Sequence, residues 1–174
     1  MRTRNSNVRA IRSSSHIASS SSNSRSLECR AGTVATNEMD SNADTCCLGS
    51  NFLILEFTNR QADVYPYDKS YRPATNIPIV TGATAWTDPM SHDTFILVFH
   101  EALFYGSSLP HSLINPNQLR HNGLTVQDNP YSDDPMGINV MQEIDIPMKS
   151  SGTKILFDSR VQLLKNCPIA LMYI

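Results

Sequence analysis

The sequence has no long apolar run, no secretion signal and little of the positive charge that binds nucleic acids. Its longest uninterrupted apolar stretch, at 95–99, is far shorter than the roughly 20 residues that a membrane span needs. No Asn-x-Ser/Thr sequence occurs, and no secretory apolar segment follows Met1. The formal net charge is −2 over 174 residues. We therefore expect a cytoplasmic protein without membrane contact, whose folded part does not bind nucleic acid directly.

Sequence motifs for several common chemistries are also missing. The four cysteines, at 29, 46, 47 and 167, form no C-x-x-C pair, and no histidine has a partner at ligand spacing. The seven glycines are scattered, so no loop that binds phosphate is present, and no serine or cysteine has the flanks of a nucleophile elbow. We expect no metal and no cofactor. The thiols should be reduced, with Cys46 and Cys47 packed beneath residues 40–45.

The N-terminal residues differ sharply in composition from the rest of the chain. Five arginines and a run of serines occur before the first acid, Glu28, and few large apolar residues accompany them. Such a segment cannot form a core, so residues 1–30 are expected to be a disordered tail or linker. A basic, serine-rich, acid-poor start also fits a mitochondrial transit peptide, which is the minor alternative for localisation.

The remainder reads as mostly β with one short helix. Strands are expected at 33–39, 51–57, 76–86, 94–99, 144–147 and 154–157, where β-branched and aromatic residues gather between turn residues. The segment 76–99, with turn residues at 87–93, is expected to form a hairpin placed as a flap over a cleft. The helix is expected at 115–122, with Asn115 as N-cap, Pro116 in the first turn and Gly123 as the stop.

Residues 38–45, Glu-Met-Asp-Ser-Asn-Ala-Asp-Thr, form the most informative segment. Asp40 follows an apolar residue at a predicted strand end, a hydroxyl residue comes next, and Ala43 is small enough for a peptide backbone to pass. Two such carboxylates about 3 Å apart share a proton, so that one can activate water while the other protonates a carbonyl. The segment occurs once, so a pair needs two chains, which predicts a symmetric homodimer. Aspartates before serine also cap turns, and this reading stays open for Asp40 and Asp44.

Four ordered blocks resemble the protease region of copia-type LTR retrotransposon polyproteins, in particular a branch of fungi, oomycetes and diatoms. They are DSNADTCCLGSNFLILEFTNRQADVYPYD at 40–68, IPIVTGATAW at 77–86, FILVFHEALFYG at 95–106 and LINPNQLRHNGLTVQDNP at 113–130. The resemblance implies a retropepsin-like closed β-barrel at 31–130. It also implies that 131–174 are spacer strands leading to an integrase region that this chain lacks.

By the same resemblance, the function would be that of an aspartic endopeptidase that processes a Gag-Pol-like polyprotein, in a virus-like particle if the element is active. Asp40 would be the catalytic carboxylate, and Ser41 would bridge to the second chain. Ala43 would line the substrate channel, and Asp44 would bind substrate backbone N–H groups or an Arg. Thr45 belongs to the same substrate-binding or loop-bracing set, and the segment 110–114 would enter the helix that braces the loop.

The chain departs from most active members at the third motif position, where Asn42 replaces glycine. Glycine lets the loop turn tightly, and asparagine tolerates left-handed backbone angles better than other residues. The alternative function is therefore a catalytically inactive retrotransposon remnant, or a dimeric interaction module with the same fold.

Overall fold

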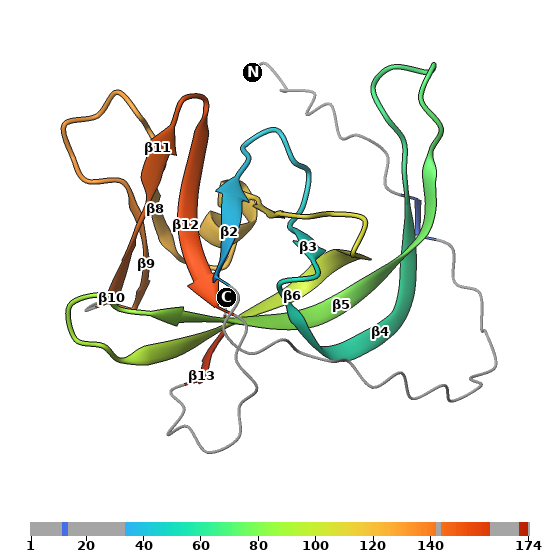
Figure 1. Cartoon of the computed structure of the whole chain (residues 1–174). Helices are drawn as coiled ribbons and strands as arrows, with labels where there is room; N and C mark the ends of the chain where they lie inside the picture. The colour runs from blue at the N-terminus through green and yellow to red at the C-terminus, as the bar shows by residue number, and fades with distance from the viewer. Residues whose placement is uncertain (1–11, 14–33, 142–143, 161–170, 174) are drawn as a thin grey trace, which may run out of the picture.

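The computed structural model describes residues 12–13, 34–141, 144–160 and 171–173, and these residues are mostly β with one short helix (Figure 1). This confirms the expected secondary-structure class. The elements, in chain order, are β1 Arg12–Ser13, β2 Val34–Met39, β3 Cys47–Gly49, β4 Leu53–Val64, β5 Ala74–Thr87, β6 Thr94–Gly106, β7 Ser112–Ile114, α1 Pro116–His121, β8 Thr125–Gln127, β9 Gly137–Met141, β10 Ile144–Pro147, β11 Lys149–Ser151, β12 Lys154–Arg160 and β13 Leu171–Tyr173.

Most of these strands belong to one large sheet. Its order is β1-β4-β5-β12-β2-β7-β3-β6-β13, with β11 paired to β12 and a further pairing between β5 and β6. The central pairs β2–β7 and β3–β6 are parallel, whereas β4–β5 and β5–β6 are antiparallel. A smaller sheet has the order β10-β9-β8. Many neighbouring strands of the large sheet are therefore far apart in the sequence.

Strands β4, β5 and β6 are long and bend strongly, so that the β4–β5 hairpin rises at one side of the molecule (Figure 1). The register shifts between Phe57 and Gln61 in β4, and again between Val80 and Gly82 in β5. Asn59 and Glu101, near these shifts, have positive φ angles of 59° and 57°. Irregularities of this kind bend a strand and increase its twist.

The core forms where β3, the long strands and the helix face one another. Phe52 and Phe99 pack edge to face with ring centroids 5.3 Å apart, which is a favoured aromatic geometry. Leu48, Ile114 and Leu119 are fully or almost fully buried around them. The core thus lies directly under the chain segments that precede and follow Asp40.

Two expectations about chain organisation, the boundary at 130/131 and the disordered N-terminal tail, concern strands of the large sheet. Strand β12, within the segment expected to be a spacer, pairs with β2 from Ile155↔Met39 to Arg160↔Val34. Residues on both sides of the expected boundary at 130/131 therefore share one sheet. In the tail expected to be disordered, residues 12–13 form β1 on the edge of β4. The rest of the tail lies outside the described residues.

Candidate functional site

Asp40 lies directly after β2, beside the end of β7. These two strands are parallel neighbours, with Met39 opposite Ile114, and the Asp40 N–H donates to the Ile114 carbonyl at 3.0 Å. The next residue after each strand, Asp40 and Asn115, is thereby brought to the same edge of the sheet. The Asn42 N–H donates to Asp40 Oδ1 at 2.9 Å, and the Ala43 N–H donates to the Asp40 carbonyl at 3.3 Å. A tight turn therefore follows the carboxylate.

Two amide side chains at the start of the helix hold this loop. The expected N-cap Asn115 is confirmed, since its Oδ1 accepts from the N–H groups of Asn117 and Gln118 at 2.7 and 3.1 Å. Its Nδ2 donates to the Ala43 carbonyl at 2.5 Å. Gln118 Oε1 accepts from Thr45 Oγ1 and from the Cys46 N–H, both at 2.8 Å. The helix thus braces the loop through neutral amides.

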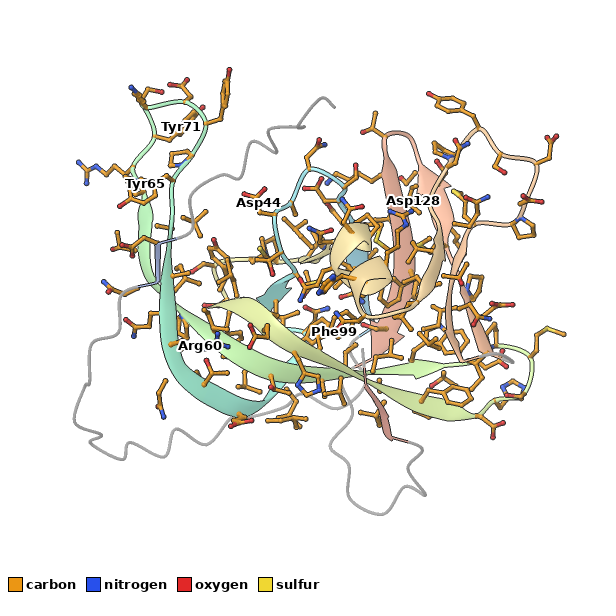
Figure 2. All side chains as sticks on the ribbon, turned by 180° about the vertical axis from the view of Figure 1, so that it is seen from behind. Asp44, Arg60, Tyr65, Tyr71, Phe99 and Asp128 are labelled. Carbon is orange, nitrogen blue, oxygen red and sulfur yellow. The ribbon has the colours of Figure 1, made fainter. Side chains whose placement is uncertain are left out.

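Five of the six expected site residues line one cavity of about 430 Å³, and only Ser41 is not part of its lining. The cavity residues from the loop are Asp40, Asn42, Ala43, Asp44 and Thr45. The other walls come from β3, the end of β4, β6 and the β6–β7 region, as Cys47, Val64, Leu103, Tyr105, Leu109 and Leu113. These wall residues carry no signal in the sequence, because each looks like an ordinary core residue. Figure 2 shows Asp44 on the loop beside the helix.

The turn at Asn42 does not use left-handed backbone. Asn42 is exposed, and it is not among the described non-glycine residues with positive φ. The φ tolerance expected of asparagine at this position is therefore not needed. What separates Asn42 from glycine here is the side chain itself, which stands in the lining of the cavity.

Asp44 is exposed and has no ion-pair or hydrogen-bond partner among the described side chains. Two of the described arginines form ion pairs elsewhere: Arg60 pairs with Glu101, and Arg120 pairs with Asp128 at 2.6 Å. Of the two roles expected for Asp44, binding of an Arg within the described part of the chain is not observed. The carboxylate is open to a ligand.

The hairpin near this cavity differs from the one expected. Val64, at the end of β4, lines the Asp40 cavity, whereas the β5–β6 turn lines a different cavity together with β12 residues. The expected flap at 76–99 is therefore wrong in position. The segment between β4 and β5 carries exposed Tyr65 and Tyr71, and Figure 2 shows them at the raised tip of the hairpin, on the same edge of the molecule as Asp44.

The two adjacent thiols face different surroundings. Cys46 is fully buried, and its Sγ accepts from the Asn115 N–H at 3.3 Å. Burial raises the pKa of the Cys46 thiol to about 12. Cys47 is only partly buried, yet burial and then the negative charges of Asp40 and Asp44 raise the pKa of its thiol to about 11. Cys46 therefore packs beneath the loop as expected, and Cys47 forms a neutral wall of the cavity.

Cys47 should react slowly with iodoacetamide in the native protein. A pKa that rises from 9.0 to about 11 leaves about a hundredfold less thiolate at neutral pH, and only the thiolate is nucleophilic. The rate should climb tenfold per pH unit well beyond pH 9, and Asp44→Asn should raise it at a given pH by removing a negative charge. Peptide mass spectrometry on timed samples resolves Cys47 from the other cysteines. Reaction of Cys47 as fast as in unfolded protein would contradict the structure.

Buried polar side chains form a hydrogen-bonded network that includes residues of β2 and β7. Asn51 Nδ2 donates to Asn37 Oδ1 at 2.7 Å, and Asn37 Nδ2 donates to Ser159 Oγ at 2.8 Å. Ser112 Oγ donates to Asn51 Oδ1 at 2.5 Å. Thr84 Oγ1 donates to Ser159 Oγ at 3.1 Å. All five side chains are buried, so the network holds in place the two strands that end just before Asp40 and Asn115.

Comparison of the chain with protein-family models, curated proteins and solved structures found no match. No helix in the described ranges has the length and hydropathy needed to cross a membrane. Within the same ranges, no three His, Cys, Asp or Glu side chains are grouped as a metal site would require. The assignment of a function therefore depends on the geometry around Asp40.

Proposed function

We propose that the chain is a retropepsin-like aspartic endopeptidase, in which Asp40 from each of two chains activates water. The observation that carries the proposal is the position of Asp40, at the end of β2, beside β7, in a turn braced by the helix residues Asn115 and Gln118. A carboxylate that must act within a pair has to be held in a fixed geometry, and these bonds hold its loop. The cavity beside it has the aliphatic walls that a peptide side chain needs.

The strand arrangement is compatible with a closed β-barrel around this site. Strand β5 pairs with both β6 and β12, and β12 continues through β2, β7 and β3 back to β6. Two of these contacts, β5–β12 and β3–β7, consist of a single residue pair each. We propose that the β4–β5 hairpin acts as the flap, because Val64, at the end of β4 next to the hairpin tip, lines the Asp40 cavity.

The proposed enzyme must be a homodimer, because each chain supplies one Asp40. Sedimentation of the full chain should reveal dimers at micromolar concentration, and cleavage per chain should fall when dilution dissociates them. The substrate is a peptide that spans an apolar junction, and one carboxyl of the pair activates water while the other protonates the carbonyl. A folded chain that cleaves equally well as a monomer would contradict the two-chain site.

The second candidate function is an inactive remnant or an interaction module with the same fold. The observation that favours it is the Asn42 side chain in the lining of the cavity, where a glycine would leave room for the peptide backbone. The two functions predict different results for one substitution.

We expect Asn42→Gly to lower stability by about 0.5–1 kcal/mol, since it relieves no positive φ and adds freedom to the unfolded chain. If the enzyme is active, cleavage of the junction peptide should change by no more than a few fold. Peptide cleavage followed by chromatography, with thermal unfolding in parallel, measures both effects. Cleavage by the glycine variant alone would favour the inactive remnant. A dimer that cleaves in neither form would leave only the interaction module.

A further inference from the structure

The segment that joins β4 to β5 carries three exposed tyrosines. Tyr65, Tyr67 and Tyr71 are 55%, 92% and 68% exposed. Figure 2 shows Tyr65 and Tyr71 at the raised tip of the hairpin. Single exposed aromatic residues are normal on a protein surface, but a group of them within one short segment marks an interaction site.

Hydrogen bonds hold the backbone of this tip in a defined turn. The Tyr71 N–H donates to the Asp68 carbonyl at 3.2 Å, and the Ser70 N–H donates to Asp68 Oδ1 at 2.9 Å. Where β5 begins, the Asn76 N–H donates to Asp63 Oδ1 at 2.8 Å. Because the turn is already ordered, a ligand that binds there loses little affinity to the ordering of the backbone.

Two cations lie among the tyrosines. Lys69 and Arg72 are exposed, and neither forms an ion pair with any residue that the structure describes. Asp68 is the only acid at 65–73, so this segment has two positive charges and one negative charge. The expectation that the folded part does not bind nucleic acid came from the net charge of the whole chain, which hides this local excess. Unpaired cations of this kind attract phosphates.

The composition of the turn favours nucleic acid over a protein partner. Asp68, Lys69 and Ser70 occupy the middle of the turn, and these three residue types are depleted in protein–protein interfaces. Aromatic rings interleaved with cations are instead typical of proteins that bind single strands, since bases stack on the rings while the cations follow the backbone.

We propose that the tip of the β4–β5 hairpin binds single-stranded nucleic acid. Bases stack on Tyr67 and Tyr71, and the two cations of the segment bind phosphates. Stacking is insensitive to base sequence, because every base has a π-face. The carboxylates of the Asp40 cavity, which Val64 lines next to the tip, repel phosphates and limit the site to a few nucleotides. This inference goes beyond the proposed peptidase activity and does not depend on it.

The test compares two labelled strands of about eight nucleotides, within the usual length of such sites. One is oligothymidine, and the other has the same sugar–phosphate backbone without bases. Both carry the same phosphates, so attraction to the arginines of the N-terminal residues is the same for both. Fluorescence anisotropy with the full-length chain should give at least about fivefold tighter binding of the strand with bases, the smallest effect expected from stacking one base.

Removal of the tyrosine rings should abolish the preference for bases. The double variant Tyr67→Ala, Tyr71→Ala should bind both strands equally, whereas Tyr67→Phe, Tyr71→Phe keeps the rings and should keep the preference. The matched control is Tyr131→Ala, which removes a tyrosine of 94% exposure from the β8–β9 loop and should also keep it. Thermal unfolding should be unchanged in all three, because these side chains are exposed and form no described hydrogen bond.

The two cations are tested through the salt dependence of binding. Lys69→Gln and Arg72→Gln should each reduce the slope of log K against log salt concentration by about 0.7, the value for one phosphate of a single strand. An unchanged slope in both variants would overturn the assignment of phosphates to this tip.

Three other results would overturn the inference. Equal binding of the two strands to the parent chain would leave the tip as a surface for a protein partner. A preference for bases that survives in the double alanine variant, or that is lost equally in Tyr131→Ala, would place the stacking elsewhere. No step of this test measures peptide cleavage, so its result is the same whether the peptidase assignment stands or fails.

Discussion

Asn51→Ala should lower the free energy of unfolding by about 3 kcal/mol. The substitution removes the donor to Asn37 Oδ1 and the acceptor of the Ser112 O–H, although Ser112 Oγ still accepts from the Gly49 N–H at 2.8 Å. Each orphaned group costs roughly 1–3 kcal/mol. Few other substitutions outside the apolar core should cost as much, because Asn37 and Ser112 are fully buried and out of reach of water. Urea denaturation followed by circular dichroism measures the change, provided that the slope of the transition stays constant.

Asn139→Ala is the matched control for this substitution. Asn139 also donates through its amide, to Asp145 Oδ1 at 2.7 Å, but this bond lies at the surface, where water can replace it. Its loss should therefore cost less than about 1 kcal/mol. The double variant with Asn37→Ala should be less destabilised than the sum of the single variants, because the two residues share a bond. If Asn51→Ala and Asn139→Ala lowered the free energy of unfolding by the same amount, the buried network would contribute no more to stability than a surface hydrogen bond.

Asp40→Asn should abolish peptide cleavage, by at least about a thousandfold, while the fold remains intact. The amide cannot accept a proton from water as the carboxylate does. The two Asp40 carboxyls of the proposed pair act as a unit, so replacing them removes most of the catalytic effect. The fold should survive because Asn Oδ1 can still accept the bond from the Asn42 N–H, the one hydrogen bond described for this carboxylate. Turnover of the junction peptide and thermal unfolding measure the two effects.

Asp134→Asn provides a control for charge alone, since Asp134 is exposed in the β8–β9 loop. This variant should cleave like the parent. Cleavage by Asp40→Asn that resists pepstatin would assign the activity to another group or to a contaminant. If Asp40→Asn unfolds, its loss of cleavage does not test the role of the carboxylate. Cleavage by Asp40→Glu would then be measured, since this variant keeps the charge but displaces it.

The sequence predicted those parts of the fold that have strong local signals. The apolar, β-branched content of β5 and β6 marks them as strands, although each extends beyond the expected ends. Asn115 followed by proline marks the helix start, and Gly123 follows its end with a φ of 86°. Local chemistry is sufficient at these places, because capping and turn formation involve only neighbouring residues.

Other parts depend on pairings between distant residues, and the sequence does not reveal them. Strands β3 and β7 have three residues each, too few for a periodic pattern, yet they frame the candidate site. Gln118 reads as an ordinary helix residue until its contacts with Thr45 and Cys46 are known. The flap was expected at the hairpin with the clearest turn residues, whereas strand bending brings the other hairpin to the cavity.

The pairing of β12 with β2 has a consequence for the order of folding. The side chains of Asn37 and Ser159 are hydrogen-bonded although the residues are 122 positions apart in the sequence. Among the described strands, β2 has no antiparallel neighbour other than β12. During synthesis, the strand that delivers Asp40 must wait for β12 before it is fully paired. Contacts of such long sequence separation form slowly. A newly made chain would thus acquire its rigid Asp40 loop late, after nearly all of the residues described here have been translated.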